Sequence, residues 1–148
     1  MKITSTIIIH NSTDVVFAWV SNPDKFIRWQ NTVKGIRNAI ASEDGTAITF
    51  EYLYEVNCLP ITAKGRIGRI KKNEYVEYII EDIIQRMSAK YILKGEENST
   101  IIKADISYCW KPPLLLSILR NWSGNKKLLE DQLVIEMNTL KRICEGKT

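Results

Sequence analysis

Residues 125–144, NKKLLEDQLVIEMNTLKRIC, decide how the rest of this chain must fold. Their apolar side chains recur at intervals of three and four residues, which is the spacing of one stripe along an α-helix. The stripe consists of Leu129, Leu133, Met137, Leu140 and Cys144. The charged side chains, Glu136 among them, are expected to lie off the stripe and to face water. Such a helix needs an apolar partner on one side only.

The partner lies upstream, where apolar and polar residues alternate along most of residues 46–110. Alternation with a period of two is typical of β-strands that bury one face. Short polar turns such as Lys71-Lys72-Asn73-Glu74 join the alternating segments. We therefore expect an antiparallel meander in which strands that are adjacent in sequence are adjacent in space.

The N-terminal part of the chain predicts a different set of elements. Residues 2–9 alternate and indicate a first strand, and residues 11–14 offer side-chain oxygens that can cap a helix. Residues 15–20 then form a short apolar helix, and Pro23 can begin a second helix that carries Trp29. The chain is thus expected to be α+β: a strand, two short helices, a sheet and a long closing helix.

Length and composition indicate one globular domain spanning residues 1–148. Hydrophobic residues make up 45% and charged residues 26%, with no apolar run near the roughly 20 residues that span a bilayer. The N-terminus lacks the pattern of a signal peptide, so we expect a cytoplasmic protein without a transmembrane segment. The net charge of +4 is mild and comes with no nucleic-acid-binding motif, so we expect no nucleic-acid partner.

Residues able to hold metals or to act as nucleophiles are few. His10 is the only histidine, and we expect it at the surface where the first strand ends. Cys58, Cys109 and Cys144 are far apart in sequence and lack a C-x-x-C pair, so we expect small core residues and no metal or cofactor. Motifs for hydrolytic triads, phosphate-binding loops and dinucleotide sites are absent from the sequence.

Two groups of residues carry a family resemblance. Residues 14–20 (DVVFAWV) and 24–29 (DKFIRW) look like an opening helix pair, and Leu133, Leu140-Lys141 and Glu145 look like a closing motif on the last helix. With the order of elements, they resemble the helix-grip fold of the START-related (SRPBCC) superfamily. That superfamily includes polyketide cyclase/dehydrase-like proteins, lipid-transfer domains and plant allergen-like carriers. The resemblance covers nearly the whole chain.

The resemblance implies a curved antiparallel sheet of about six or seven strands that wraps around the C-terminal helix and leaves an apolar cavity between them. Its expected lining is Phe50, Tyr52, Tyr54, Val56, Ala63, Gly65, Tyr78, Ile80, Ile102, Ala104, Ile106, Tyr108, Leu133, Met137 and Leu140. The small residues among these would leave space, and the tyrosines would supply apolar walls with polar tips. Without the resemblance, the composition and the alternation favour a filled core over a ligand cavity.

Asp82 is the one acidic residue on the apolar face of its strand. If it were buried, its pKa would be raised, and it could transfer protons or hold the polar end of a ligand. The simpler interpretation, which the sequence favours, is that the strand ends or bulges there and that Asp82 points to solvent.

The resemblance, taken together with these patterns, implies three possible functions. The first is to bind or carry a small hydrophobic molecule such as a lipid, an isoprenoid or a polyketide-like compound. The second is a cyclase/dehydratase-type enzyme that uses a tyrosine or Asp82. The third is a protein-interaction domain, as in co-chaperone or ribosome-associated relatives. It would use either the outer face of the sheet or residues 114–122, from Leu114 to Trp122, as an exposed apolar patch. Because no convergent set of polar residues is evident, binding ranks above catalysis.

Overall fold

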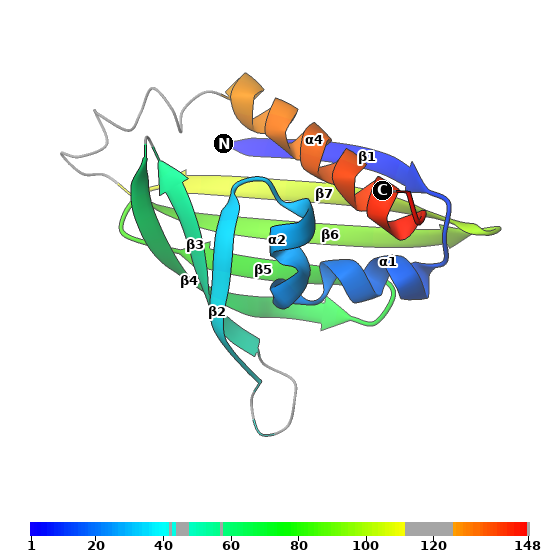
Figure 1. Cartoon of the computed structure of the whole chain (residues 1–148), viewed down its shortest axis with the longest axis horizontal. Helices are drawn as coiled ribbons and strands as arrows, with labels where there is room; N and C mark the ends of the chain where they lie inside the picture. The colour runs from blue at the N-terminus through cyan, green and yellow to red at the C-terminus, as the bar shows by residue number, and fades with distance from the viewer. Residues whose placement is uncertain (42, 44–47, 57, 112–125, 148) are drawn as a thin grey trace.

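A curved sheet and a long helix dominate the computed structural model, which describes residues 1–41, 43, 48–56, 58–111 and 126–147. Within these residues, seven antiparallel strands are arranged in the order β1-β7-β6-β5-β4-β3-β2 (Figure 1). The strands are β1 Lys2–Ile9, β2 Val33–Ala41, β3 Ile48–Val56, β4 Leu59–Lys71, β5 Tyr75–Glu81, β6 Gln85–Glu96 and β7 Ser99–Trp110. The helices are α1 Thr13–Val20, the 3₁₀-helix η1 Pro23–Lys25, α2 Phe26–Trp29 and α4 Lys126–Cys144.

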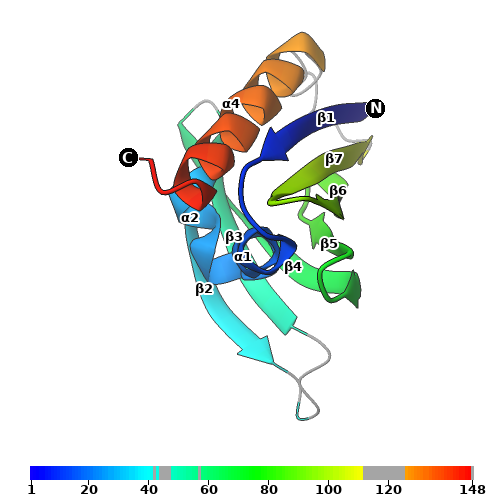
Figure 2. The same ribbon diagram turned by 90° about the vertical axis from the view of Figure 1, so that its right-hand side faces the viewer.

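The sheet is a meander from β2 to β7, and the N-terminal strand β1 pairs with β7 to complete it. It curls so that the described helices α1, η1, α2 and α4 lie on its concave side, with α4 along the open side of the curve (Figure 2). The α+β class, the two short helices after the first strand and the closing helix are confirmed.

The helix pair packs against one end of the concave face. Ser12 caps α1 by accepting a hydrogen bond from the backbone N–H of Val15, and Pro23 occupies the first turn of η1. Phe26 of α2 makes edge-to-face contacts with the rings of Phe50 and Tyr78, at centroid distances of 6.0 and 5.0 Å. Aromatic rings therefore fill this end of the space under the sheet.

The C-terminal end of α4 is fastened to β1 by a group of polar contacts that we call the Glu145 latch. The carboxylate of Glu145 accepts hydrogen bonds from the backbone N–H of His10 and from Lys141 Nζ, each at 2.8 Å. Lys147 Nζ lies 3.4 Å from the same carboxylate, and Lys141 also donates to the carbonyl of Ile8 at 2.6 Å. These partners hold the pKa of Glu145 at about 2. The latch gives a physical role to the lysine and glutamate of the closing motif.

The structure corrects one expectation about the cysteines. Cys144 is buried, but Cys58 and Cys109 are exposed, so the prediction of three core cysteines was wrong. Cys58 lies in the turn between β3 and β4 with a φ of 66°, and Cys109 alternates outward along β7. His10 is exposed at the end of β1, as expected. The predicted apolar patch at residues 114–122 lies outside the described residues.

Candidate functional site

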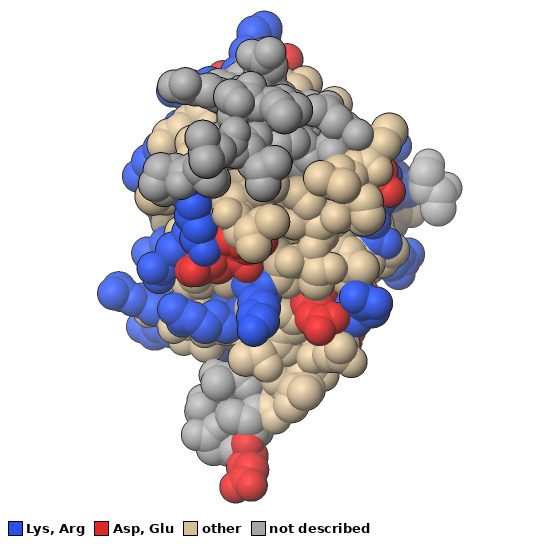
Figure 3. Space-filling model, turned by 90° about the vertical axis from the view of Figure 1, so that its left-hand side faces the viewer, with Lys and Arg blue, Asp and Glu red and all other residues tan. Residues whose placement is uncertain are grey.

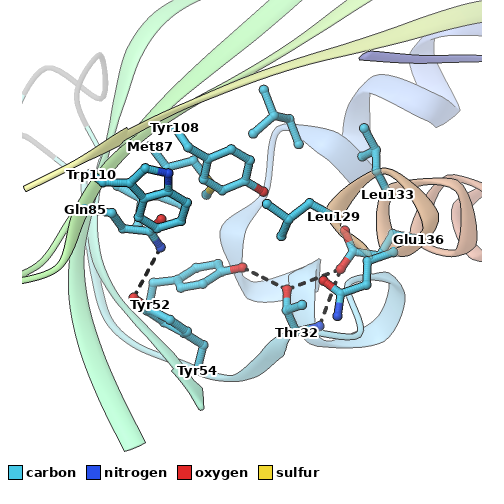
Figure 4. A pocket seen from close by; sticks show the side chains of 13 residues that line it. Thr32, Tyr52, Tyr54, Gln85, Met87, Tyr108, Trp110, Leu129, Leu133 and Glu136 are labelled. Atoms are coloured by element: carbon cyan, nitrogen blue, oxygen red, sulfur yellow. Dashed lines mark hydrogen bonds between the residues drawn. The ribbon is translucent and has the colours of Figure 1, made fainter. Parts of the chain in front are cut away.

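A hollow of about 60 Å³ lies between the concave face of the sheet and the first half of α4 (Figure 4). A second hollow of about 40 Å³ lies beside it, and the two share much of their lining. The larger is lined by Thr32, Tyr52, Tyr54, Ile80, Gln85, Met87, Ile106, Tyr108, Trp110, Leu129, Gln132, Leu133 and Glu136. The smaller adds Phe26, Gln30, Tyr78, Ala89 and Tyr91.

The volume of the hollows limits what they can hold. A single water molecule needs roughly 10–15 Å³ measured in this way. The two spaces therefore have room for a few waters as they stand. An engineered cavity that binds benzene measures about 150 Å³, so a ring compound requires some of the surrounding side chains to move. The hollows do not extend to Gly65, because the ring of Phe50 on the neighbouring strand lies against it. A Cβ atom added at Gly65 would overlap that ring. The expectation that Gly65 leaves space was wrong, because the Phe50 ring fills that space.

The structure divides the predicted lining into two groups. Residues that border the hollows are Tyr52, Tyr54, Tyr78, Ile80, Ile106, Tyr108 and Leu133. Residues that are buried elsewhere under the sheet, away from both hollows, are Phe50, Ala63, Gly65, Ile102, Ala104, Met137 and Leu140. The side chain of Val56 is not among those described.

Asp82 follows the last residue of β5, so the strand ends where the sequence suggested. Its side chain is nevertheless buried, and the prediction that it points to solvent was wrong. The carboxylate accepts hydrogen bonds from the backbone N–H groups of Ile84 and Gln85, at 2.7 and 3.0 Å, and from the hydroxyl of Tyr54. It borders neither hollow, although it is among the residues that line a separate, open depression. Its hydrogen bonds organise the β5–β6 turn and hold Tyr54.

Glu136, which was expected to face water, is buried and borders both hollows. It accepts hydrogen bonds from the backbone N–H and the hydroxyl of Thr32, at 3.4 and 3.2 Å. Burial raises the pKa of its carboxyl to about 7. The sequence did hold a signal, because Glu136 follows Leu129 by seven residues and Leu133 by three, which places it on the apolar stripe.

Tyrosine hydroxyls and amides surround this carboxyl. The hydroxyl of Tyr52 donates to Gln30 Oε1 at 3.2 Å and lies 3.5 Å from the hydroxyl of Thr32. Burial, with a smaller effect of the charge on Glu136, raises the pKa of Tyr52 and Tyr108 well above the ordinary range. Near neutral pH these tyrosines are therefore uncharged, whereas Glu136 exists in both protonation states.

The outer side of the sheet has a different character. An open depression of about 930 Å³ lies there, lined by residues that include Lys64, Arg66 and Arg86. Lysine and arginine side chains are interspersed with acidic ones on one face of the molecule (Figure 3). Several pair across the surface, such as Lys111 with Glu81 at 2.9 Å. Such exposed pairs are typical of a solvated face.

Metal-binding clusters and membrane-spanning helices are both missing from the part of the chain that the structure describes. Among those residues, no three histidine, cysteine or acidic side chains are grouped so as to hold a metal ion. No helix among them combines the length and the apolar character that crossing a bilayer requires.

Comparison with known proteins gives a match of structure without a match of sequence. Neither a protein-family model nor a curated protein sequence matches this chain. Among solved structures, TTHA0849 from Thermus thermophilus superposes with a TM-score of 0.77 and 12% identity, over 99% of this chain and 98% of that one. The Zhui aromatase/cyclase from Streptomyces sp. R1128 superposes with a TM-score of 0.78 and 10% identity, over 98% of this chain and 93% of that one. A START superfamily protein from Mycobacterium smegmatis superposes with a TM-score of 0.70 and 13% identity, over 98% of this chain and 94% of that one.

The chain has the helix-grip, START-like fold. The matches extend over nearly the full length of each protein, which agrees with the order of strands and helices described above. At this level of identity they concern the fold, and one fold serves many functions. The function of this chain therefore depends on the residues that line its own hollow.

Proposed function

We propose that this protein binds a small, largely apolar molecule in the hollow between the sheet and α4. The observation that carries the proposal is a space under the sheet that is mostly walled by apolar and aromatic side chains and has one buried carboxyl at its edge. Pockets for small ligands combine apolar walls with a few well-placed polar groups in this way. The helix-grip fold is consistent with such a role.

The dimensions of the hollow favour a compact ligand. Of the three chemistries expected from the sequence, an extended lipid is the largest, and it is the least compatible with spaces of about 60 and 40 Å³. A molecule with a single ring or a short branched chain fits them better. Its apolar part would contact Ile80, Ile106 and Leu133, and its polar end would lie toward Thr32 and Glu136.

Filling the hollow tests the proposal. Leu129→Trp would occupy the larger hollow from α4, whereas Ile135→Trp places the same side chain on the exposed side of the same helix. We expect native mass spectrometry of protein purified from cells, and thermal-shift screening of small ring compounds, to find a ligand for the parent and for Ile135→Trp. Leu129→Trp should lose it. Ligand retention by a folded Leu129→Trp variant would disprove the location.

Catalysis is a second candidate, and Glu136 is the observation that favours it. A carboxyl with a pKa of about 7 can both donate and accept a proton at neutral pH. In a cyclase-type reaction, Glu136 would take the role that the sequence analysis considered for Asp82, whose carboxylate is committed to the β5–β6 turn. This candidate predicts that Glu136→Gln abolishes turnover of a compound that the variant still binds.

A further inference from the structure

Glu136 is a buried carboxyl whose recorded hydrogen-bond partners are uncharged. Its carboxylate accepts hydrogen bonds from the backbone and hydroxyl of Thr32, and the backbone N–H of Asn31 also stabilises it. Among the described residues, no lysine, arginine or histidine forms an ion pair with it, although Glu145, further along the chain, has Lys141 and Lys147. An ionised carboxylate in a dry site is unfavourable unless a cation or further donors compensate it. The hollow beside Glu136 is where such a partner can be placed.

The walls of the hollow suit a positive charge. Tyr52 and Tyr108 border the space in front of Glu136, and Trp110 stacks on Tyr108 with a centroid distance of 5.6 Å and an interplanar angle of 8° (Figure 4). The faces of aromatic rings carry partial negative charge and attract ammonium groups. Rings beside a buried carboxylate thus form an environment that favours a cation over a neutral group of the same shape.

A second acceptor lies in the same hollow. Gln85 Oε1 is buried and has no hydrogen-bond partner among the described residues, while the Nε2 atom of the same amide donates to Tyr54 at 3.3 Å. Buried acceptors without a partner are rare, and they indicate a bound donor such as water or a ligand. Glu136 and Gln85 therefore both call for hydrogen-bond donors from whatever fills the hollow.

We infer that the ligand is a small organic amine, whose protonated nitrogen pairs with Glu136 and whose apolar part lies against Tyr108 and Ile106. This inference rests on the proposed function and specifies its ligand class. The size of the hollow restricts the amine to a compact one, such as an arylalkylamine.

The pairing makes binding depend on pH. Besides Glu136, the titratable groups that face this carboxyl are Tyr52 from β3, Tyr91 from β6 and Tyr108 from β7, and burial raises the pKa of all three. They stay neutral between pH 6 and 8.5, and an alkylammonium with a pKa of about 10 stays charged. Glu136 is then the group that titrates in this range, and it must be ionised to hold the amine.

The experiment measures binding of three matched probes by calorimetry at pH 6 and pH 8.5: 2-phenylethylamine, 2-phenylethanol and 3-phenylpropionate. We expect the amine to bind at least about tenfold more tightly than the alcohol at pH 8.5 and the carboxylate to bind weakest. Between pH 8.5 and pH 6 the affinity for the amine should fall about tenfold, as protonation of one group with a pKa of about 7 requires. Binding of the alcohol should change little.

Glu136→Gln should remove both the preference for the amine and its pH dependence. Glu130→Gln, on the same helix but paired with Lys126 at the surface, should retain both. If the alcohol binds the parent as tightly as the amine at both pH values, the inference is overturned. The proposed function then still stands, provided that Leu129→Trp abolishes alcohol binding. If none of the three probes binds, the inference is also overturned, and the native mass spectrometry described above decides the proposed function by itself.

Discussion

Two glutamates, Glu136 within α4 and Glu145 directly after it, have the same side chain in opposite electrostatic environments. Glu145 lies at the C-terminal end of the helix, where Lys141, Lys147 and the backbone of His10 compensate its charge and hold its pKa at about 2. Glu136 lies two to three turns earlier, beside the hollow, where burial raises its pKa to about 7. The first carboxylate closes the fold, and the second is left for an outside partner.

The surroundings of the two groups differ in the same way. Around Glu145 the helix packs directly on β1, and Leu140 and Cys144 beside it are buried. Around Glu136 the packing is incomplete, because the hollow separates the helix from the sheet. Functional groups are often held in energetically unfavourable states by a scaffold that is stable elsewhere, and this division along α4 fits that description.

The largest expected effect compares the C-terminal half of α4, which is tightly packed, with its N-terminal half, which borders the hollow. Leu140→Ala should lower the free energy of unfolding by about 2–5 kcal/mol, because Leu140 is fully buried and its removal opens a new cavity. Leu129→Ala should cost clearly less, because Leu129 already borders empty space. Urea unfolding of both variants measures the difference. Equal losses would show that the two halves of α4 are packed alike.

The second effect concerns Glu136 and has the opposite sign. A folded-state pKa of about 7 against an ordinary value of 4.5 means that the folded protein loses stability as the pH rises from 4.5 to 7. The cost is complete above pH 7 and corresponds to about 3 kcal/mol. Glu136→Gln should therefore be more stable than the parent by up to that amount at pH 8, and nearly equal to it at pH 4.5. Urea unfolding of the parent and the variant at both pH values measures this difference. If Glu136→Gln is less stable than the parent at pH 8, burial does not raise the pKa of Glu136 as described.

The third effect tests the Glu145 latch. Glu145→Gln should lower stability at pH 7 by about 1.5–3 kcal/mol, because hydrogen bonds from the His10 backbone and from Lys141 lose their charged acceptor. Since the folded-state pKa is depressed to about 2, the contribution is present above pH 4.5 and disappears as the pH falls toward 2. Thermal unfolding from pH 7 to pH 2.5 should show the difference shrinking. Glu130→Gln, whose pair with Lys126 is exposed, serves as the control and should change stability little.

The smallest effect isolates the cation of the latch. Lys141→Met keeps the apolar stem but removes the ammonium that joins Glu145 to the carbonyl of Ile8, and we expect a loss of about 1 kcal/mol. Lys147 and the His10 N–H still compensate the carboxylate, which limits the loss. Unfolding midpoints in low salt and in 1 M salt should differ less for this variant than for the parent. An unchanged midpoint at low salt would mean that Lys141 contributes nothing to the latch.

The fold could be predicted well from the sequence, because the spacing of apolar residues along the chain determines which segments form strands and which form helices. Alternation along the strands and the three- and four-residue spacing of α4 depend only on which residues are apolar, so they survive without any knowledge of contacts. The lining of a cavity came from the family resemblance, and Tyr52, Ile106 and Leu133 from that lining border the hollow, whereas residues such as Ala63 and Met137 do not.

The polar part of the site was predicted poorly, because it depends on where individual side chains meet. Glu136 was assigned to water on the basis of its charge, although its spacing from Leu129 places it on the buried stripe. Asp82 was assigned to solvent because its binding to the turn backbone is visible only once that turn is folded. Gly65 was expected to leave space, and only the cross-strand register with Phe50 shows what fills it.

The distance between the Glu145 latch and the hollow has an evolutionary consequence. Glu136 and Glu145 are nine positions apart, which corresponds to about 13 Å of helical rise, and the two groups share no hydrogen-bond partner among the described residues. Substitutions at distant, independent positions have nearly additive effects, so a lineage can exchange the residues around the hollow while the latch preserves the closed domain. A protein built in this way can acquire a new specificity without having to find a new way to fold.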